Sequence, residues 1–176
     1  MSLTDILKGK WLGHPLHPIF VHIPAGLWPA ALIFDLVSIS QFGGNGMVRL
    51  SFYCIALGLA ATLFAIPTGL VDWSGIKKEK PAWKLGLYHM VGNLFVTALF
   101  AANLGLRAEK FQTAVRVDTP ELVLSIIGTL FLFVSAYLGG LMVFDQGTSV
   151  ARNSKKKWRT IAERGNANLP PDKEKQ

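Results

Sequence analysis

The sequence predicts an all-α membrane protein in which four transmembrane helices form an up-and-down bundle. Hydrophobic residues make up 51% and charged residues only 16% of the 176 positions, which is more apolar than usual for a soluble chain. The apolar residues gather in four runs of about 22 residues, enough for a helix to cross a hydrocarbon core roughly 30 Å thick. No strand alternation appears, and helices of this length satisfy their own backbone hydrogen bonds in lipid.

The four runs carry few ionisable groups. His22 and Asp35 are the only such groups in the first run, and His89 is the only one in the third. Pro24, Pro29 and Pro67 fall inside runs, where a membrane helix tolerates them as kinks. The predicted spans are residues 19–40, 50–71, 85–106 and 122–144.

Three regions follow from this pattern: an amphipathic N-terminal segment with a His-Pro motif (1–18), a four-helix transmembrane domain (19–145) and a polar, basic tail (146–176). Ser2 is a candidate helix cap, and Trp11 is placed to lie in the headgroup layer. His14 and His17 each precede a proline, which favours extended backbone at both positions.

Charge distribution predicts the orientation. Fourteen Lys and Arg residues fall in the termini and the connection between spans two and three, against four on the opposite side. The positive-inside rule therefore predicts a multi-pass protein of a bacterial inner membrane with both termini in the cytoplasm. Topology and anionic headgroups account for the net charge of +7, so we expect the lipid bilayer and other membrane or redox subunits as partners, and no nucleic acid.

Most of the unusual polar residues are predicted to meet at the cytoplasmic side. His22 and His89 each lie four residues into their helices, roughly 6 Å below the start. The first and third helices of such a bundle are diagonal, a geometry that lets two imidazoles bind one haem iron. The sequence therefore predicts haem b between His22 and His89, with Gly26 and Gly92 giving room and Asn93 bonding a propionate or a ligand's other ring nitrogen.

Two other interpretations stay open. One is a non-haem iron or zinc site, with ligands drawn from six side chains. The other is a cofactor-free structural or accessory subunit in which these groups form an interhelical hydrogen-bond cluster. Neither a nucleophile–base set nor a phosphate loop is found, so no catalytic residue is assigned and enzyme activity is left open. The candidate metal ligands are His14, His17, His22, His89, Asp72 and Asp145.

Asp35 lies apart from this group, roughly 20 Å beyond His22 along the first helix. We expect it to pair with Asn103 or Tyr53 in a structural role, with a proton or quinone role as the alternative.

Several motifs together resemble those of the uncharacterised bacterial membrane-protein family catalogued as domain of unknown function 2231. The resemblance covers roughly residues 12–150 and implies a four-helix membrane protein. Some members are joined to Rieske iron–sulfur or quinoprotein-type dehydrogenase modules, which implies a subunit of a membrane electron-transfer complex. The motifs are His14-Pro-x-His17-Pro-x3-His22-x-Pro24, Gly69-x-x-Asp72-Trp73, His89 with Asn93, and Gly139-Gly140 to Asp145-x-Gly147.

Overall fold

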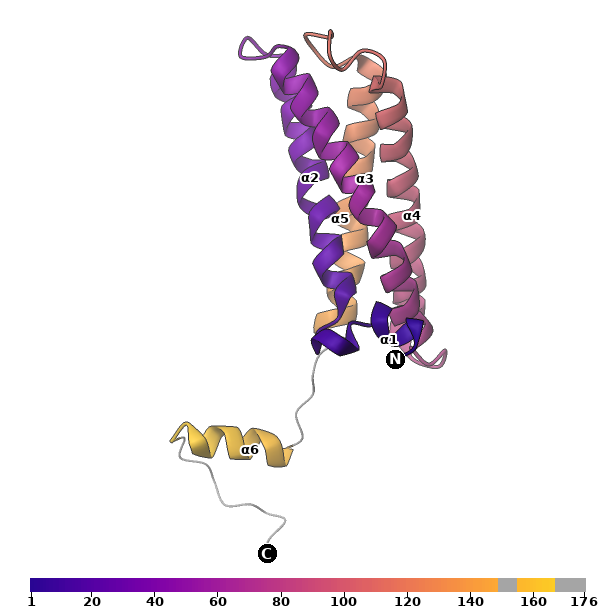
Figure 1. Cartoon of the computed structure of the whole chain (residues 1–176), viewed down its shortest axis with the longest axis vertical. Helices are drawn as coiled ribbons and strands as arrows, with labels where there is room; N and C mark the ends of the chain where they lie inside the picture. The colour runs from indigo at the N-terminus through magenta and orange to yellow at the C-terminus, as the bar shows by residue number, and fades with distance from the viewer. Residues whose placement is uncertain (149–154, 167–176) are drawn as a thin grey trace, which may run out of the picture.

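The computed structural model describes residues 1–148 and 155–166. Within these residues, four helices are long and apolar enough to cross a membrane (Figure 1). They confirm the predicted all-α class with four transmembrane helices. The helices are α2 (Leu16–Ser38), α3 (Asn45–Ser74), α4 (Pro81–Arg107) and α5 (Thr119–Phe144).

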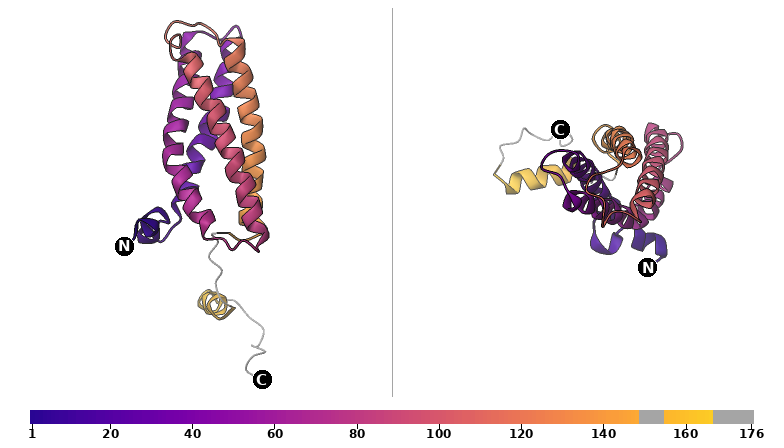
Figure 2. Two further views of the ribbon diagram at one scale, coloured as in Figure 1. Left: turned by 90° about the vertical axis from the view of Figure 1, so that its right-hand side faces the viewer. Right: turned by 90° about the horizontal axis from the view of Figure 1, so that it is seen from above.

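The four helices run up and down as a bundle built from two hairpins. Helix α2 packs mainly on α3, and α4 packs mainly on α5, while α3–α4 and α2–α5 contacts join the hairpins (Figure 2). Helices α2 and α4 are therefore diagonal, as predicted. We call the end where α2 and α4 begin and α3 and α5 finish the histidine end. The opposite end, with connections 39–44 and 108–118, is the ion-pair end.

The N-terminal segment forms two short helical pieces, α1 (Leu3–Leu7) and a 3₁₀ turn, η1 (Lys10–Leu12). Ser2 and Asp5 form a capping box at the start of α1, which confirms the predicted cap. Gly9 has a φ of +67°, and a Cβ there would meet the carbonyl oxygen of His14 at 2.1 Å. Glycine is therefore required where the chain turns back toward the membrane domain.

Helix α2 begins earlier than predicted. Pro15 is extended, but Leu16 already starts the helix, so His17 lies in its first turn and not on extended backbone. Pro18 follows in the same turn, where its missing N–H would have had no intrahelical acceptor. This early start decides which histidine enters the bundle.

The middle of the bundle is held by two stacked aromatic rings. Trp28 of α2 and Phe100 of α4 have ring centroids 4.4 Å apart at an interplanar angle of 18°. Both side chains are fully buried, and the indole N–H donates to the carbonyl of Ile55 at 3.4 Å. Ala31 and Val96 complete this layer, in which the two large rings fill the space between the diagonal helices.

The predicted tail is described in part. Helix α6 (Lys155–Arg164) is formed, while residues 149–154 and 167–176 lie outside the described residues.

Candidate functional site

Two histidines from diagonal helices meet at the histidine end. His17 in the first turn of α2 and His89 in α4 have ring centroids 6.4 Å apart, with ring planes at 89°. Both side chains are partly buried. Two imidazoles that bind one metal from opposite sides have centroids roughly 6 Å apart, because each metal–nitrogen bond is about 2 Å long and each ring nitrogen lies about 1 Å from its centroid. The spacing therefore fits a shared metal.

The neighbouring helices fix the orientation of both rings. Nδ1 of His17 lies 2.9 Å from the carbonyl oxygen of Ala65, and Nδ1 of His89 lies 2.7 Å from that of Ser135. A carbonyl oxygen only accepts, so both Nδ1 atoms carry the proton. In the neutral imidazole, Nε2 then keeps its lone pair, which is the tautomer that binds metals.

The two Nε2 atoms have different surroundings. Asn93, one turn after His89, donates its amide N–H to Nε2 of that ring at 3.0 Å and to the His89 carbonyl at 2.9 Å. Asn93 was expected to bond a propionate or a ligand's other ring nitrogen, but it bonds Nε2, the nitrogen that would bind a metal, while Nδ1 bonds the Ser135 carbonyl. A metal at Nε2 of His89 would replace the amide hydrogen bond.

Glycines on the neighbouring helices make room for both imidazoles. A Cβ added at Gly69 of α3 would lie 2.7 Å from the His17 ring, and one added at Gly139 of α5 would lie 2.8 Å from the His89 ring. Any side chain at either position would push the imidazole away. The two rings are therefore seated directly on the backbones of α3 and α5.

The structure places the remaining predicted histidines elsewhere. His22 is exposed on α2, with Nδ1 against the Pro18 carbonyl, and His17 instead of His22 faces His89. His14 is exposed before α2, with Nδ1 3.0 Å from the carbonyl of Pro15.

The predicted glycines and aspartates are also separated. Gly26 is exposed and borders open space, whereas Gly92 faces Ser135 beside His89. Asp72 is partly buried and interacts electrostatically with His17, while Asp145 is exposed at the end of α5. In the described part of the chain, no three His, Cys, Asp or Glu side chains come together in a metal-binding arrangement.

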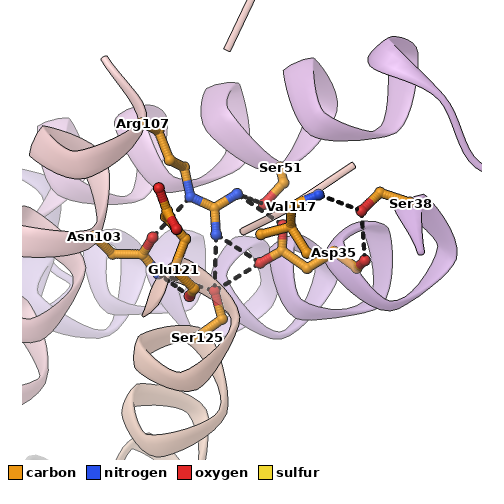
Figure 3. A network of polar contacts seen from close by, with 8 residues as sticks. All are labelled: Asp35, Ser38, Ser51, Asn103, Arg107, Val117, Glu121 and Ser125. Atoms are coloured by element: carbon orange, nitrogen blue, oxygen red, sulfur yellow. Dashed lines mark hydrogen bonds and ion pairs between the residues drawn. The ribbon is translucent and has the colours of Figure 1, made fainter. Parts of the chain in front are cut away.

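A buried ion pair occupies the other end of the bundle (Figure 3). The two guanidinium NH groups of Arg107 bond the two carboxylate oxygens of Asp35, both at 2.7 Å. The side chains are 3% and 0% exposed. Asp35 was expected to pair with Asn103 or Tyr53, but its partner is Arg107, the last residue of α4, which lies one position beyond the predicted span 85–106.

Hydroxyl and amide groups surround the pair from the other helices. Nε of Arg107 donates to Asn103 at 2.7 Å, and its NH1 donates to Ser51 at 2.9 Å. Ser125 donates to Asp35 at 2.7 Å and accepts from Arg107 at 3.2 Å. All four helices contribute to this network, which matches the requirement that intramembrane charges be paired and solvated by protein.

Glu121 closes the network on the outside. One of its carboxylate oxygens lies 3.3 Å from Nζ of Lys110, and the other is buried without a hydrogen-bond partner among the described residues. Hydrogen bonds to Asp118 and Glu121 raise the pKa of Lys110, which lies outside the helices. Lys110 therefore supplies a positive charge beside Glu121 at the edge of the network.

Sequence reasoning paired His89 with His22 for haem and named His17 only among the candidate metal ligands, and it missed Arg107 as the partner of Asp35. Both residues lie 72 positions from a counterpart on the other diagonal helix, as 17 to 89 and 35 to 107. That common separation is the signal in the sequence that would have found both pairs.

Four long apolar helices, closed around a buried ion pair and a histidine pair, define an integral membrane protein of the four-helix bundle class. The chain belongs to the family described as "Predicted membrane protein (DUF2231)", whose match covers residues 13–152. This confirms the resemblance found in the sequence. Comparisons with curated proteins and with solved structures gave no significant match.

Proposed function

We propose that this protein is an integral membrane subunit of an electron-transfer complex and that it binds haem b between His17 and His89. The observation that carries the proposal is the pair of imidazoles from diagonal helices, 6.4 Å apart, with both Nδ1 atoms donating to backbone carbonyls. The sequence-based pair was His22 and His89; the exposed position of His22 moves the proposed ligand to His17. The proposal keeps the predicted inner-membrane location with cytoplasmic termini.

The number of ligands favours haem over a bare ion. A porphyrin supplies four nitrogen ligands and leaves two axial positions for the protein, whereas a structural zinc needs four protein ligands. The site offers two imidazoles that face each other across the bundle. Haem held by two imidazoles supplies one-electron transfer without an open position for oxygen.

The surrounding residues have defined parts in this proposal. The Ala65 and Ser135 carbonyls hold the tautomer and raise the basicity of the ligand nitrogens. Gly69 and Gly139 keep the two rings seated on α3 and α5. Asn93 holds Nε2 of His89 in the absence of a metal and turns away when one binds.

The test is a reduced-minus-oxidised absorption spectrum of the detergent-purified protein after haem-replete expression, with a parallel metal assay. We expect one haem per chain in the wild type, and loss of the haem bands in His17→Ala and in His89→Ala. His22→Ala is the matched control, because His22 is exposed on the same helix and should keep the bands. A wild type without haem bands, or bands lost only in His22→Ala, contradicts the proposal.

A cofactor-free accessory subunit is the second candidate, and the hydrogen bond from Asn93 favours it. In that function the rings act as packing groups, each satisfied by a backbone carbonyl and seated on a glycine. Pale protein of normal stability that loses stability in His17→Ala and His89→Ala would support this second candidate.

A further inference from the structure

The two hairpins carry corresponding residues at identical spacings. The first helix of each hairpin has a histidine, an aromatic residue eleven positions later and a charged residue seven positions after that. The three pairs share one separation of 72 residues. A duplicated hairpin produces one common separation along each of its two helices. The residues are His17, Trp28 and Asp35 in α2 and His89, Phe100 and Arg107 in α4.

The second helix of each hairpin repeats the surface that receives these side chains. At four glycines, an added Cβ would lie between 2.2 and 2.8 Å from the aromatic or imidazole ring packed on it. The corresponding glycines are 70 residues apart, as are the two carbonyls that accept from the histidines. The glycines are Gly58 and Gly69 in α3 and Gly128 and Gly139 in α5; the acceptor residues are Ala65 and Ser135.

Corresponding residues of the two hairpins also contact each other. The His17 and His89 rings are 6.4 Å apart. The two mid-bundle aromatic rings stack at 4.4 Å, and the carboxylate and guanidinium at the far end bond at 2.7 Å. Two copies of a unit meet through the same residue only on a twofold axis. Three such layers in succession place a pseudo-twofold axis along the length of the bundle.

We propose that the membrane domain consists of two copies of one helical hairpin about this pseudo-twofold axis, and that the His17–His89 pair is a symmetric binding site on it. The ligand class is then one that presents an equivalent face to each imidazole. A metalloporphyrin with two free axial positions has this property. The ligand class rests on the proposed haem function, whereas the repeat rests on the common sequence separations and on the contacts between side chains.

The copies differ in charge where Asp35 meets Arg107. Two identical hairpins would bring like charges together at this buried layer, which costs several kcal/mol at an interface. Opposite charges instead favour the pairing of the first copy with the second and disfavour pairing of either copy with itself. The charge difference in this layer therefore favours assembly of the two copies with each other within one chain.

An exchange across the axis tests the repeat in the full chain. Trp28→Phe and Phe100→Trp are made singly and together. In the double variant, the indole introduced by Phe100→Trp should pack on Gly128 as Trp28 packs on Gly58. Its N–H should donate to the Ser125 carbonyl, since Ser125 corresponds to Ile55. Each single variant should lower the thermal midpoint in detergent, and the double variant should recover most of the loss. A double variant that loses the sum of the two single losses overturns the repeat.

Glycine substitutions test the repeat without changing the aromatic pair. Gly58→Ala and Gly128→Ala should lower the thermal midpoint by similar amounts, because each added Cβ meets a ring on the axis. Gly26→Ala is the control, since Gly26 borders open space. Loss of stability at only one of the two axial glycines would contradict the equivalence of the hairpins.

Titration of the purified full chain with haem b tests the symmetric site separately. His17→Ala and His89→Ala should weaken binding by a comparable factor, and the exchange of Trp28 and Phe100 should leave the stoichiometry at one per chain. Binding that survives in one histidine variant overturns the symmetric site. Absence of haem binding in the wild type overturns the ligand class and the proposed function, while recovery in the aromatic exchange would still support the repeat.

Discussion

Replacing Arg107 by methionine should strongly destabilise the membrane domain. The guanidinium makes five hydrogen bonds, two of them to Asp35, and both charged side chains are almost completely buried. Arg107→Met leaves the carboxylate buried without its partner. Breaking a buried pair in this way costs about 3–5 kcal/mol, which is roughly a 150- to 5,000-fold change in the folding equilibrium.

Removing both charges should be much less harmful. Replacing a buried pair with apolar groups of similar volume is often neutral, or stabilising by about 1–4 kcal/mol. The double variant Asp35→Leu/Arg107→Met should therefore recover most of the stability lost in Arg107→Met. The gap between the double variant and the sum of the singles measures the coupling of the pair.

The assay is equilibrium unfolding of purified protein in mixed micelles with increasing SDS, followed by far-UV circular dichroism. Lys10→Met is the control, because Lys10 pairs with Asp5 in the N-terminal segment, where the two side chains are 64% and 27% exposed. Solvent screens such a pair, so its midpoint should stay close to that of the wild type. An Arg107→Met midpoint no lower than that of Lys10→Met would refute the reasoning, as would a double variant that loses the sum of both single losses.

Three further predictions concern other sites. The hydrogen bond from Lys10 lowers the pKa of Asp5 to about 2. The contact therefore stabilises the first helical turn fully at pH values above the ordinary carboxyl pKa, and this stabilisation is lost as the pH falls through about 2. An NMR titration midpoint near 3.8 for Asp5 would contradict the prediction. Thr129→Val should raise the thermal midpoint and stabilise the protein by about 1–3 kcal/mol, because the buried Thr129 hydroxyl has no hydrogen-bond partner among the described residues. Thr62→Val should not raise the midpoint, because the Thr62 hydroxyl bonds the carbonyl three residues earlier. Reporter fusions at Gly44 and at the carboxyl terminus should report opposite sides of the membrane, and a common side would refute the predicted topology.

The transmembrane helices could be predicted because they depend on local composition. Each run is uncharged or nearly so over about the length of a bilayer crossing, and no tertiary contact is needed to see this. Helix starts such as Thr119-Pro120 are also local signals. The last residues of the helices could not be predicted in the same way. Hydropathy falls after Leu106, yet Arg107 continues α4 with its charge turned into the bundle.

The histidine pair could not be predicted from depth alone. His22 lies five residues after His17, which turns it by about 140° around the helix, so the two cannot face the same partner. The first residue of α2 determines how deep each histidine lies in the bundle, and the face of the helix determines which side chain it meets. Neither can be found by counting residues after a proline. Comparing the two halves of the sequence at one common separation would have identified the pair. Only His17 has the same spacing to Trp28 and Asp35 as His89 has to Phe100 and Arg107.

The ion pair at the far end also constrains how the chain enters the membrane during synthesis. Asp35 leaves the ribosome 72 residues before Arg107, and each charge alone is costly in hydrocarbon. The first hairpin therefore gains by staying beside the insertion machinery until α4 has emerged, because its carboxylate has no counter-charge before then. A chain truncated ahead of Arg107 carries an unpaired acid within its first span. The ion pair that holds the finished bundle together can thus form only after α4 has joined the first hairpin.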